Sequence, residues 1–219
     1  LFRPRDKGSL NAPRPIFLYA GRVAVEKNIE AFLRLELPGT QYVVGGGPDL
    51  KMLKKKYPRA HFAGIQPPDE MARYMAAADV FVFPSLTDTF GLVILEALAS
   101  GVPVAAYPVQ GPIDIIEDGV TGCLNNDLQR AALDVLTQSI DSDRCRRQAQ
   151  LYTWEACTRQ FLGHLMRIAT AGSGTARAAS AAAEAVGAAT TTTAAVAAQD
   201  QGTDAAVTRR QATAPTAHA

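Results

Sequence analysis

Short runs of apolar residues recur along the greater part of the chain, and most of them stop at a glycine or a proline. These runs occupy residues 16–20, 42–44, 61–64, 80–83 and 103–107. Each has the length and mostly apolar character of a strand buried in a parallel sheet. The intervening and following segments predict helices over residues 28–35, 49–57, 69–78 and 127–136, and over much of 141–168. Strands that alternate with helices in this way predict an α/β fold, a doubly wound, Rossmann-like parallel sheet flanked by helices.

The ends of the chain have a different composition from its centre. Residues 1–14 are polar and contain proline, which indicates a linker, and residues 15–170 hold the alternating pattern. Residues 171–219 are rich in Ala, Thr, Gly and Ser and contain no Leu, Ile, Phe, Tyr or Trp. Such a segment buries too little apolar area to offset the entropy lost on ordering. We therefore expect a disordered tail over 171–219.

Composition and charge restrict the class of protein. Hydrophobic residues make up 47% and charged residues 20% of the chain, as in soluble globular proteins. A formal net charge of +1 gives no reason to expect a nucleic-acid partner. Three widely spaced cysteines show no metal-ligand pattern and indicate free thiols in a reducing compartment, the cytoplasm. No apolar run approaches the roughly 18 residues of a membrane span.

The loops that follow the predicted strands favour a single ligand site. The strands of a parallel sheet end at one edge, and ligands bind beyond that edge. The loops begin at Gly21, Gly45, Gly64, Pro84 and Pro108. Because these positions all follow predicted strands, we expect their loops to meet at one edge.

The segment PSLTDTFGLVILEALASG at residues 84–101 is the most informative part of the sequence. A helix that opens near Phe90 would present free backbone N–H groups to an anion. Asp88 lies just before this junction and Glu96 eight positions later. Two carboxylates beside an anion site suit a diphosphate between two hydroxyl-rich ends, that is, a nucleotide sugar. Asp88 could instead cap the helix, whereas Glu96 inside LVILEALA has no evident partner and would be costly to bury.

Two cations follow the first predicted strand. Arg22 and Lys27 leave the same strand end, and a guanidinium with an ammonium suits a diphosphate. The alternative is an ordinary surface arginine and a Glu26–Lys27 ion pair. The Gly-rich turn at residues 45–47 either lets a ligand approach the backbone or is purely structural.

Several motifs in order resemble one enzyme family. They are GR-x-x-x-EKN at residues 21–28, VVGGGP at 43–48, AAADVFVFPS at 76–85, and the segment from Pro84 onward. Over residues 15–136 they resemble the donor-binding, C-terminal domain of retaining glycosyltransferases of the GT-B fold, family 4, within which mannosyltransferase-like members are most similar. The resemblance implies transfer of a hexose, such as mannose from GDP-mannose, to a sugar, lipid or polyol acceptor with retention.

The resemblance also implies roles for individual residues. Arg22 and Lys27 would hold the diphosphate, Asp88 the transferred sugar, and Glu96 the ribose hydroxyls. Further donor contacts are implied at Gly21, Gly46, Ile65 (beside the base), Thr89, Phe90, Gly91 and Leu92. The pair Asp88–Thr89 departs from the Glu–Gly usual in the family. No metal or cofactor is expected, because the cations and the helix N-terminus would neutralise the diphosphate.

Other activities and partners stay open at this point. We expect the acceptor to bind an N-terminal domain outside this chain, with peripheral association at the inner membrane face. A phosphorylase or synthase of similar architecture is a second enzyme reading. A catalytically inactive nucleotide-sugar-binding module, or a truncated fragment lacking the acceptor domain, is the alternative from a different class.

Overall fold

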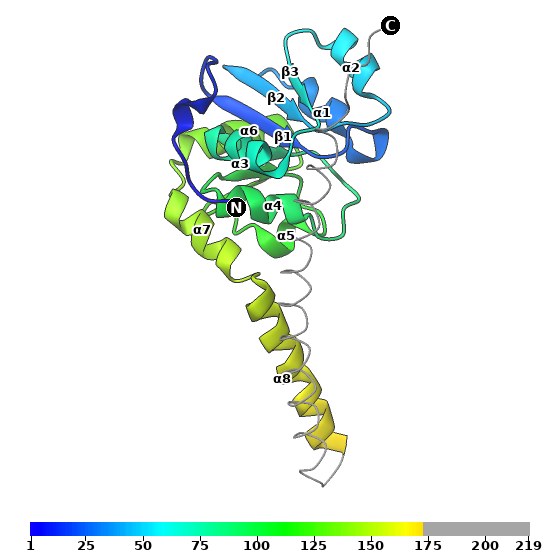
Figure 1. Ribbon diagram of the computed structural model, residues 1–219, viewed down its shortest axis with the longest axis vertical. Coiled ribbons are helices and arrows are strands. Elements are labelled where there is room, and N and C mark those ends of the chain that lie inside the picture. Colours follow the sequence, from blue (N-terminus) through cyan, green and yellow to red (C-terminus); the bar gives the residue numbers. More distant parts are fainter. Residues whose placement is uncertain (173–219) are drawn as a thin grey trace, which may run out of the picture. The chain divides into compact units, whose positions relative to one another are not determined.

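The computed structural model describes residues 1–172, with side chains to residue 167 (Figure 1). The predicted disordered tail therefore lies, apart from its first two residues, outside the described part. Two units are distinguished: residues 1–153, which contain the sheet, and a second unit that begins with the helix α8, Trp154–Gly172. Each unit is described by itself.

Six parallel strands form one sheet, which confirms the predicted α/β, Rossmann-like fold. They are β1 (Ile16–Ala20), β2 (Thr40–Val44), β3 (His61–Gly64), β4 (Val80–Phe83), β5 (Val104–Ala106) and β6 (Gly122–Leu124). Their spatial order is β3-β2-β1-β4-β5-β6, so the direction of winding reverses between β1 and β4. In doubly wound sheets this reversal opens a crevice at the carboxyl ends of the two central strands.

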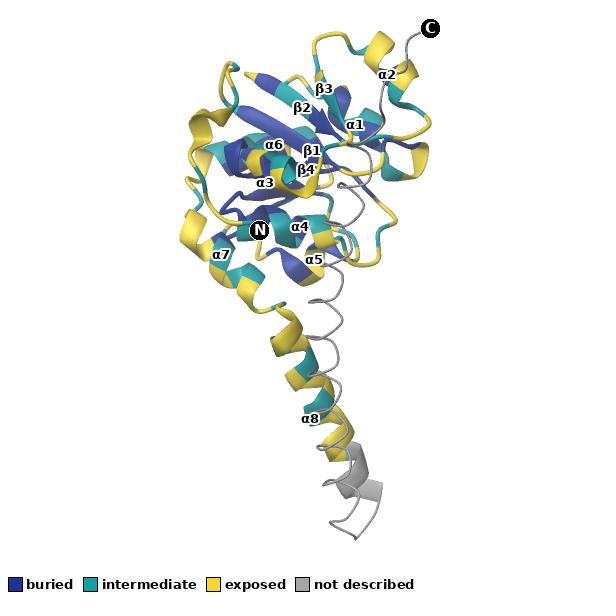
Figure 2. Ribbon diagram, viewed as in Figure 1, coloured by how far each residue is buried: buried dark blue, intermediate teal, exposed yellow. Residues whose placement is uncertain are grey.

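Helices cover both faces of the sheet (Figure 1). In the described residues they are η1 (Lys7–Ser9), η2 (Val25–Lys27), α1 (Ile29–Leu33), α2 (Leu50–Lys56), α3 (Pro68–Ala77), α4 (Leu92–Ala99), α5 (Pro112–Ile115), α6 (Leu128–Thr137) and α7 (Ser142–Gln150), besides α8. Alternate residues of β1 enter two different cores, since side chains of a strand point to opposite faces. Leu18 packs in the core that includes α3, α4 and α7, and Phe17 in the core that includes α1, α2 and α6. The central strands β1 and β4 are buried along their whole length, whereas the edge strand β3 is not (Figure 2).

The helices predicted over 69–78 and over much of 141–168 both form. α3 begins at Pro68, with Pro67 at the N-cap position and Asp69 in its first turn. The segment 141–168 holds two helices, α7 and α8, with a break at residues 151–153 between them. Tyr152 accounts for part of this break, because its hydroxyl donates to the Asp114 carbonyl and its ring lies 5.9 Å from that of Phe90.

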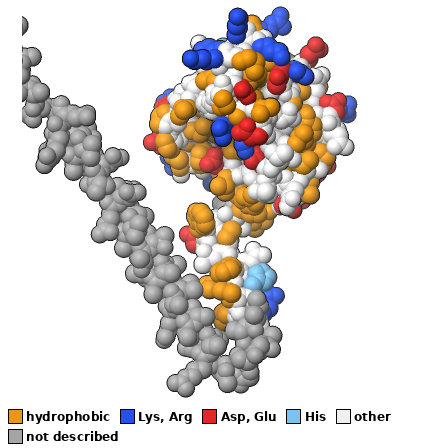
Figure 3. Space-filling view, turned by 90° about the vertical axis from the view of Figure 1, so that its right-hand side faces the viewer, with side chains coloured by type: hydrophobic (Ala, Val, Ile, Leu, Met, Phe, Trp, Pro, Cys, Tyr) orange, Lys and Arg blue, Asp and Glu red, His pale blue; other side chains and the backbone are white. Residues whose placement is uncertain are grey.

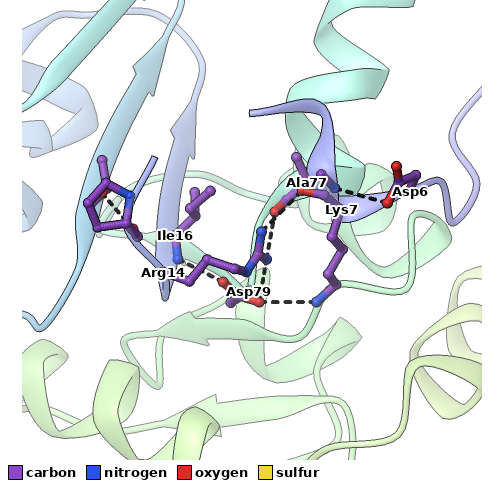
Figure 4. A network of polar contacts seen from close by, with 9 residues as sticks. Asp6, Lys7, Arg14, Ile16, Ala77 and Asp79 are labelled. Carbon is purple, nitrogen blue, oxygen red and sulfur yellow. Dashed lines mark hydrogen bonds and ion pairs between the residues drawn. The ribbon is translucent and has the colours of Figure 1, made fainter. Parts of the chain in front are cut away.

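The N-terminal segment, expected to be a linker, is tied to the amino end of the sheet (Figure 4). Asp79 accepts hydrogen bonds from the backbone N–H of Ile16 at 2.8 Å, from Arg14 at 2.6 Å and from Lys7 at 3.2 Å. Burial alone would raise the pKa of Asp79, but the hydrogen bonds from Arg14 and Ile16 outweigh it and lower the pKa. This network lies at the edge of the sheet opposite the strand ends that carry the predicted site.

The lysines of α2 lie on its exposed face. Lys51, Lys54, Lys55 and Lys56 are all exposed, while Leu53 between them is buried in the core. Lys and Arg side chains gather at the upper end of the view in Figure 3, the end at which Figure 1 places α2. Lys56 binds Glu30, and this ammonium contributes most to lowering the pKa of Glu30 to about 2.

Candidate functional site

A cavity of about 520 Å³ opens where β1 and β4 end, at the reversal point of the sheet. Residues from the β1 loop, the β4–α4 loop and α4 form most of its wall. Its lining consists of Tyr19, Ala20, Gly21, Arg22, Lys27, Met71, Phe83, Ser85, Asp88, Thr89, Phe90, Gly91, Leu92, Val93 and Glu96. Nine of the eleven predicted site residues therefore meet in one cavity; the two that do not are Gly46 and Ile65.

Arg22 lines the cavity, with its backbone carbonyl held by a hydrogen bond and its side chain exposed. The Tyr19 hydroxyl donates a 2.6 Å hydrogen bond to the Arg22 carbonyl. Burial, with smaller contributions from the carboxylates of Asp88 and Glu26, raises the pKa of Tyr19, so this donor keeps its proton. The guanidinium lies 3.5 Å from Glu26 and its side chain is 65% exposed. Exposed pairs of this kind are weak, so an anion can take the guanidinium from Glu26.

Lys27 and Asp88 bind each other across the two loops. The Nζ atom lies 2.5 Å from the Asp88 Oδ1 atom, and the side chains are only 30% and 22% exposed. The alternative from the sequence, a pair between Glu26 and Lys27, is thus not the one that forms. The two predicted ligand contacts share a single ion pair, which a diphosphate must rearrange before it can use Lys27.

The first turn of α4 is an uncapped helix N-terminus. Gly91 occupies the N-cap position with φ 85°, and no side chain caps the helix. The alternative role of Asp88 as a cap is therefore not realised. Within the described residues, the N–H groups of Leu92 and Val93 donate to no backbone or side-chain acceptor. These amides and the helix dipole favour a negative group at this end of the cavity.

Glu96 lies deeper in the cavity, on α4. Its carboxylate makes no hydrogen bond or ion pair with other described residues, and burial raises its pKa. A partly buried carboxylate without a partner is unfavourable for the protein alone. It is, however, a ready acceptor for ligand hydroxyl groups.

Ser85 is a lining residue that the sequence reasoning missed. The residue is 2% exposed, and its hydroxyl has no hydrogen-bond partner in the described part of the chain. Its position directly after β4 and Pro84 was the available signal, because residues that follow a strand of a parallel sheet reach the ligand edge.

The glycine-rich loop after β2, residues 45–47, packs against the backbone of a neighbouring loop. The sequence alone left open whether these glycines are structural or let a ligand approach. A Cβ atom on Gly45 would lie 1.9 Å from the Gly21 carbonyl oxygen, and one on Gly47 would lie 2.1 Å from that of Val23. The loop thus lies directly on the backbone of the β1 loop, which only glycine permits. Gly46 faces the side chain of Ile65, which is 82% exposed. The predicted donor contacts of Gly46 and Ile65 stay predictions.

Gly111 packs against the backbone of the loop that carries Asp88, a role that was not evident from the sequence. A Cβ atom there would lie 3.0 Å from the carbonyl oxygens of both Asp88 and Phe90, and φ is 91°. Glycine at this position lets the loop before α5 pack against the loop that carries Asp88.

Neither a metal-binding cluster nor a membrane-spanning helix is found among the described residues. They contain no group of three or more His, Cys, Asp or Glu side chains placed to hold a metal ion. Among the same residues, no helix has both the length and the apolar character needed to cross a membrane.

Residues 14–139 match the family described as glycosyl transferases group 1. Because this match covers more than half of the chain, the chain belongs to that family. The parallel sheet with its flanking helices likewise matches glycosyltransferase structures of the GT-B fold.

Individual relatives show the same similarity. Sulfoquinovosyl transferase SQD2 of Arabidopsis thaliana is 36% identical over 163 residues, which are 66% of this chain and 32% of that protein. A GDP-mannose-dependent alpha-mannosyltransferase of Corynebacterium glutamicum is 36% identical over 157 residues, 67% of this chain and 38% of that protein. The structure of sucrose-phosphate synthase from Thermosynechococcus elongatus has a TM-score of 0.66 and 32% identity, covering 78% of this chain and 50% of that one. The chain therefore spans about a third to a half of the length of these relatives.

Proposed function

We propose that this chain is the donor-binding, C-terminal part of a retaining glycosyltransferase. It binds a nucleotide sugar and takes part in transfer of the hexose to a sugar, lipid or polyol acceptor. The acceptor site belongs to a further, N-terminal domain of the whole enzyme. One observation carries the proposal: two cations, an uncapped helix N-terminus and an unpartnered carboxylate line one cavity at the reversal point of the sheet, within the described part of the chain.

The proposed binding mode follows the charges along this cavity. The diphosphate lies against the first turn of α4 and exchanges contacts with Arg22 and Lys27. Glu96 accepts hydrogen bonds from the ribose hydroxyls, and Asp88, released from Lys27, accepts from the hexose. The base extends toward Ile65, outside the cavity. No metal ion is required in this arrangement, since the cations and amides supply the positive charge.

Catalysis in this proposal consists of positioning and charge stabilisation. The bond between the anomeric carbon and the diphosphate oxygen breaks, and the oxygen of the acceptor hydroxyl bonds to the same face of that carbon while its proton passes to the departing diphosphate oxygen. Negative charge then grows on the departing nucleoside diphosphate. Once Arg22 and Lys27 have exchanged their carboxylate partners for the diphosphate, they and the α4 amides stabilise this charge in the transition state. No side chain of the chain acts as a nucleophile.

We propose GDP-mannose as the donor. The support is the sequence similarity to a relative named as a GDP-mannose-dependent alpha-mannosyltransferase. The charged groups of the cavity address the diphosphate, which all nucleoside-diphosphate sugars share. Titration with different nucleotides therefore has to identify the base.

A nucleotide-sugar-binding module without transfer is the second candidate. It is favoured by the Lys27–Asp88 pair, which occupies two residues that transfer would need. Supplying the missing N-terminal domain in trans separates the two candidates. Turnover of a bound donor appears only if the chain is part of an enzyme.

The experiment that tests the proposed function is calorimetric titration with GDP-mannose, UDP-glucose, GDP and UDP. At least one nucleoside diphosphate should bind, and Arg22→Ala should weaken it about tenfold or more, since charge-assisted hydrogen bonds contribute about 1.5–3 kcal/mol. Arg130→Ala is the matched control, because Arg130 is 67% exposed and also pairs with a carboxylate four residues away. Equal affinities for both variants and the unmodified chain would contradict the phosphate assignment.

A further inference from the structure

Asn28 is both the C-cap residue of η2 and the N-cap residue of α1. Its φ is 50° and its ψ 30°, a left-handed conformation that few non-glycine residues adopt. Asparagine at an N-cap normally bonds to an amide of its own helix. Here the side chain makes no such cap bond. The side chain therefore forgoes the local stabilisation that this position usually provides.

The amide of Asn28 reaches a different loop instead. Its Nδ2 group donates a 3.0 Å hydrogen bond to the carbonyl of Pro84, a buried residue at the end of β4. Two further contacts join the same pair of loops: the Lys27–Asp88 ion pair at 2.5 Å and a 3.4 Å bond from the Thr87 hydroxyl to the Glu26 carbonyl. Three successive residues of the β1 loop are thus attached to the β4–α4 loop.

A bound anion would break one of these contacts between the loops and leave another intact. The Lys27–Asp88 pair lies in the cavity, and a diphosphate competes directly for the Lys27 ammonium. The Asn28–Pro84 bond is uncharged and involves a carbonyl that is not in the cavity lining. It can persist when Lys27 exchanges Asp88 for phosphate. Because Asn28 follows Lys27 in the chain, this bond fixes the backbone from which the ammonium extends.

We infer that Asn28 is a positioning residue that keeps Lys27 at the anion end of the cavity once a ligand has displaced Asp88. The inference rests on the proposed function, since it requires a phosphate-bearing ligand. It assigns to the side chain of Asn28 a role that acts only through Lys27. Removing the Asn28 amide should therefore matter for binding only while Lys27 is present.

A double-mutant cycle with Asn28→Gly and Lys27→Ala tests this dependence. Glycine accepts the left-handed conformation, so Asn28→Gly removes the amide without adding backbone strain. Ser139→Gly is the matched control, because Ser139 is the other described non-glycine residue with positive φ, at 46°. GDP and UDP are the probes, titrated by calorimetry to millimolar concentration, with melting temperatures recorded for each variant.

Asn28→Gly should weaken binding about tenfold in the unmodified chain and less than twofold in the Lys27→Ala background. Its melting temperature should fall slightly, because the carbonyl of the buried Pro84 loses its Asn28 partner, and Ser139→Gly should change neither affinity nor melting temperature. Asn28→Ser, whose side chain is too short to reach Pro84, should repeat the result if the glycine variant folds poorly. Equal losses in both backgrounds, or none in either, would overturn the inference. If the unmodified chain binds neither GDP nor UDP, the proposed function fails first, and this inference fails with it.

Discussion

Replacing Glu96 by glutamine should make the protein more stable and its ligand binding weaker. Glu96 is partly buried on α4, its carboxylate has no partner among the described residues, and burial raises its pKa. Glutamine has nearly the same shape but carries no charge that must be removed from water. The substitution therefore separates two effects of the carboxylate: how much it lowers the free energy of unfolding, and how much it contributes to ligand affinity.

The expected gain is about 1 kcal/mol, within the range that single stabilising substitutions commonly give. For a chain of this size, 1 kcal/mol corresponds to roughly 2–4 °C in melting temperature. Loss of a charge-assisted hydrogen bond to the ribose should cost about 1.5–3 kcal/mol of binding free energy. That is roughly a tenfold to hundredfold loss of affinity for a nucleoside diphosphate.

The pH dependence of stability gives an independent check on the cause. A carboxyl group whose pKa is higher in the folded protein than in the unfolded chain favours folding when protonated, and this contribution is lost as pH rises through the folded pKa. The difference in free energy of unfolding between Glu96→Gln and the unmodified chain should therefore have its largest value at pH 7. It should narrow toward pH 4, where the glutamate is increasingly protonated.

Thermal unfolding across pH 4–8, together with calorimetric titration of GDP and UDP at pH 7, measures both effects. Glu70→Gln on α3 is the control, since the Glu70 side chain is 42% exposed, lies outside the cavity and is paired with Arg73. A less stable Glu96→Gln variant with unchanged affinity would refute the reasoning, because it would make Glu96 a structural residue.

Two other substitutions probe the opposite edge of the sheet and the ion pair in the cavity. Asp79→Asn should lower stability by about 2 kcal/mol, since it weakens charge-assisted hydrogen bonds to Arg14 and Lys7. Because the pKa of Asp79 is lowered, this loss should be full at neutral pH and shrink as pH falls below about 4; a loss constant with pH in thermal unfolding would contradict it. Asp88→Asn should bind GDP or UDP about fivefold more tightly, because it frees Lys27 and removes a like charge worth about 1 kcal/mol of repulsion. Weaker binding in calorimetry would mean that Asp88 is needed to hold Lys27 in place.

Much of the fold was predictable because its strands are continuous apolar runs ended by glycine or proline. Residues 16–20, 61–64 and 80–83 were predicted with the bounds that the structure shows. Their shared carboxyl edge is enough to place Arg22 and Glu96 near each other from the sequence. Strand β6 was harder to predict, since its three residues, Gly122–Leu124, are too few to carry a periodic pattern.

The details of the site depended on contacts between segments far apart in the sequence. Nothing in the spacing of Lys27 and Asp88, 61 positions apart, indicates that they form an ion pair. The orientation of the Asn28 amide toward Pro84 is equally a result of tertiary packing. Glycines are ambiguous for the same reason: Gly45 and Gly47 could be assigned to backbone packing only once the neighbouring carbonyls were placed.

A crystal structure of this chain with GDP or UDP bound would show whether the cavity between β1 and β4 is a nucleotide-sugar site. The diphosphate should lie within hydrogen-bond distance of Arg22 and the first-turn amides of α4, with the ribose hydroxyls on Glu96. A nucleotide held elsewhere, for example on the lysine face of α2, with this cavity empty, would contradict the proposed function.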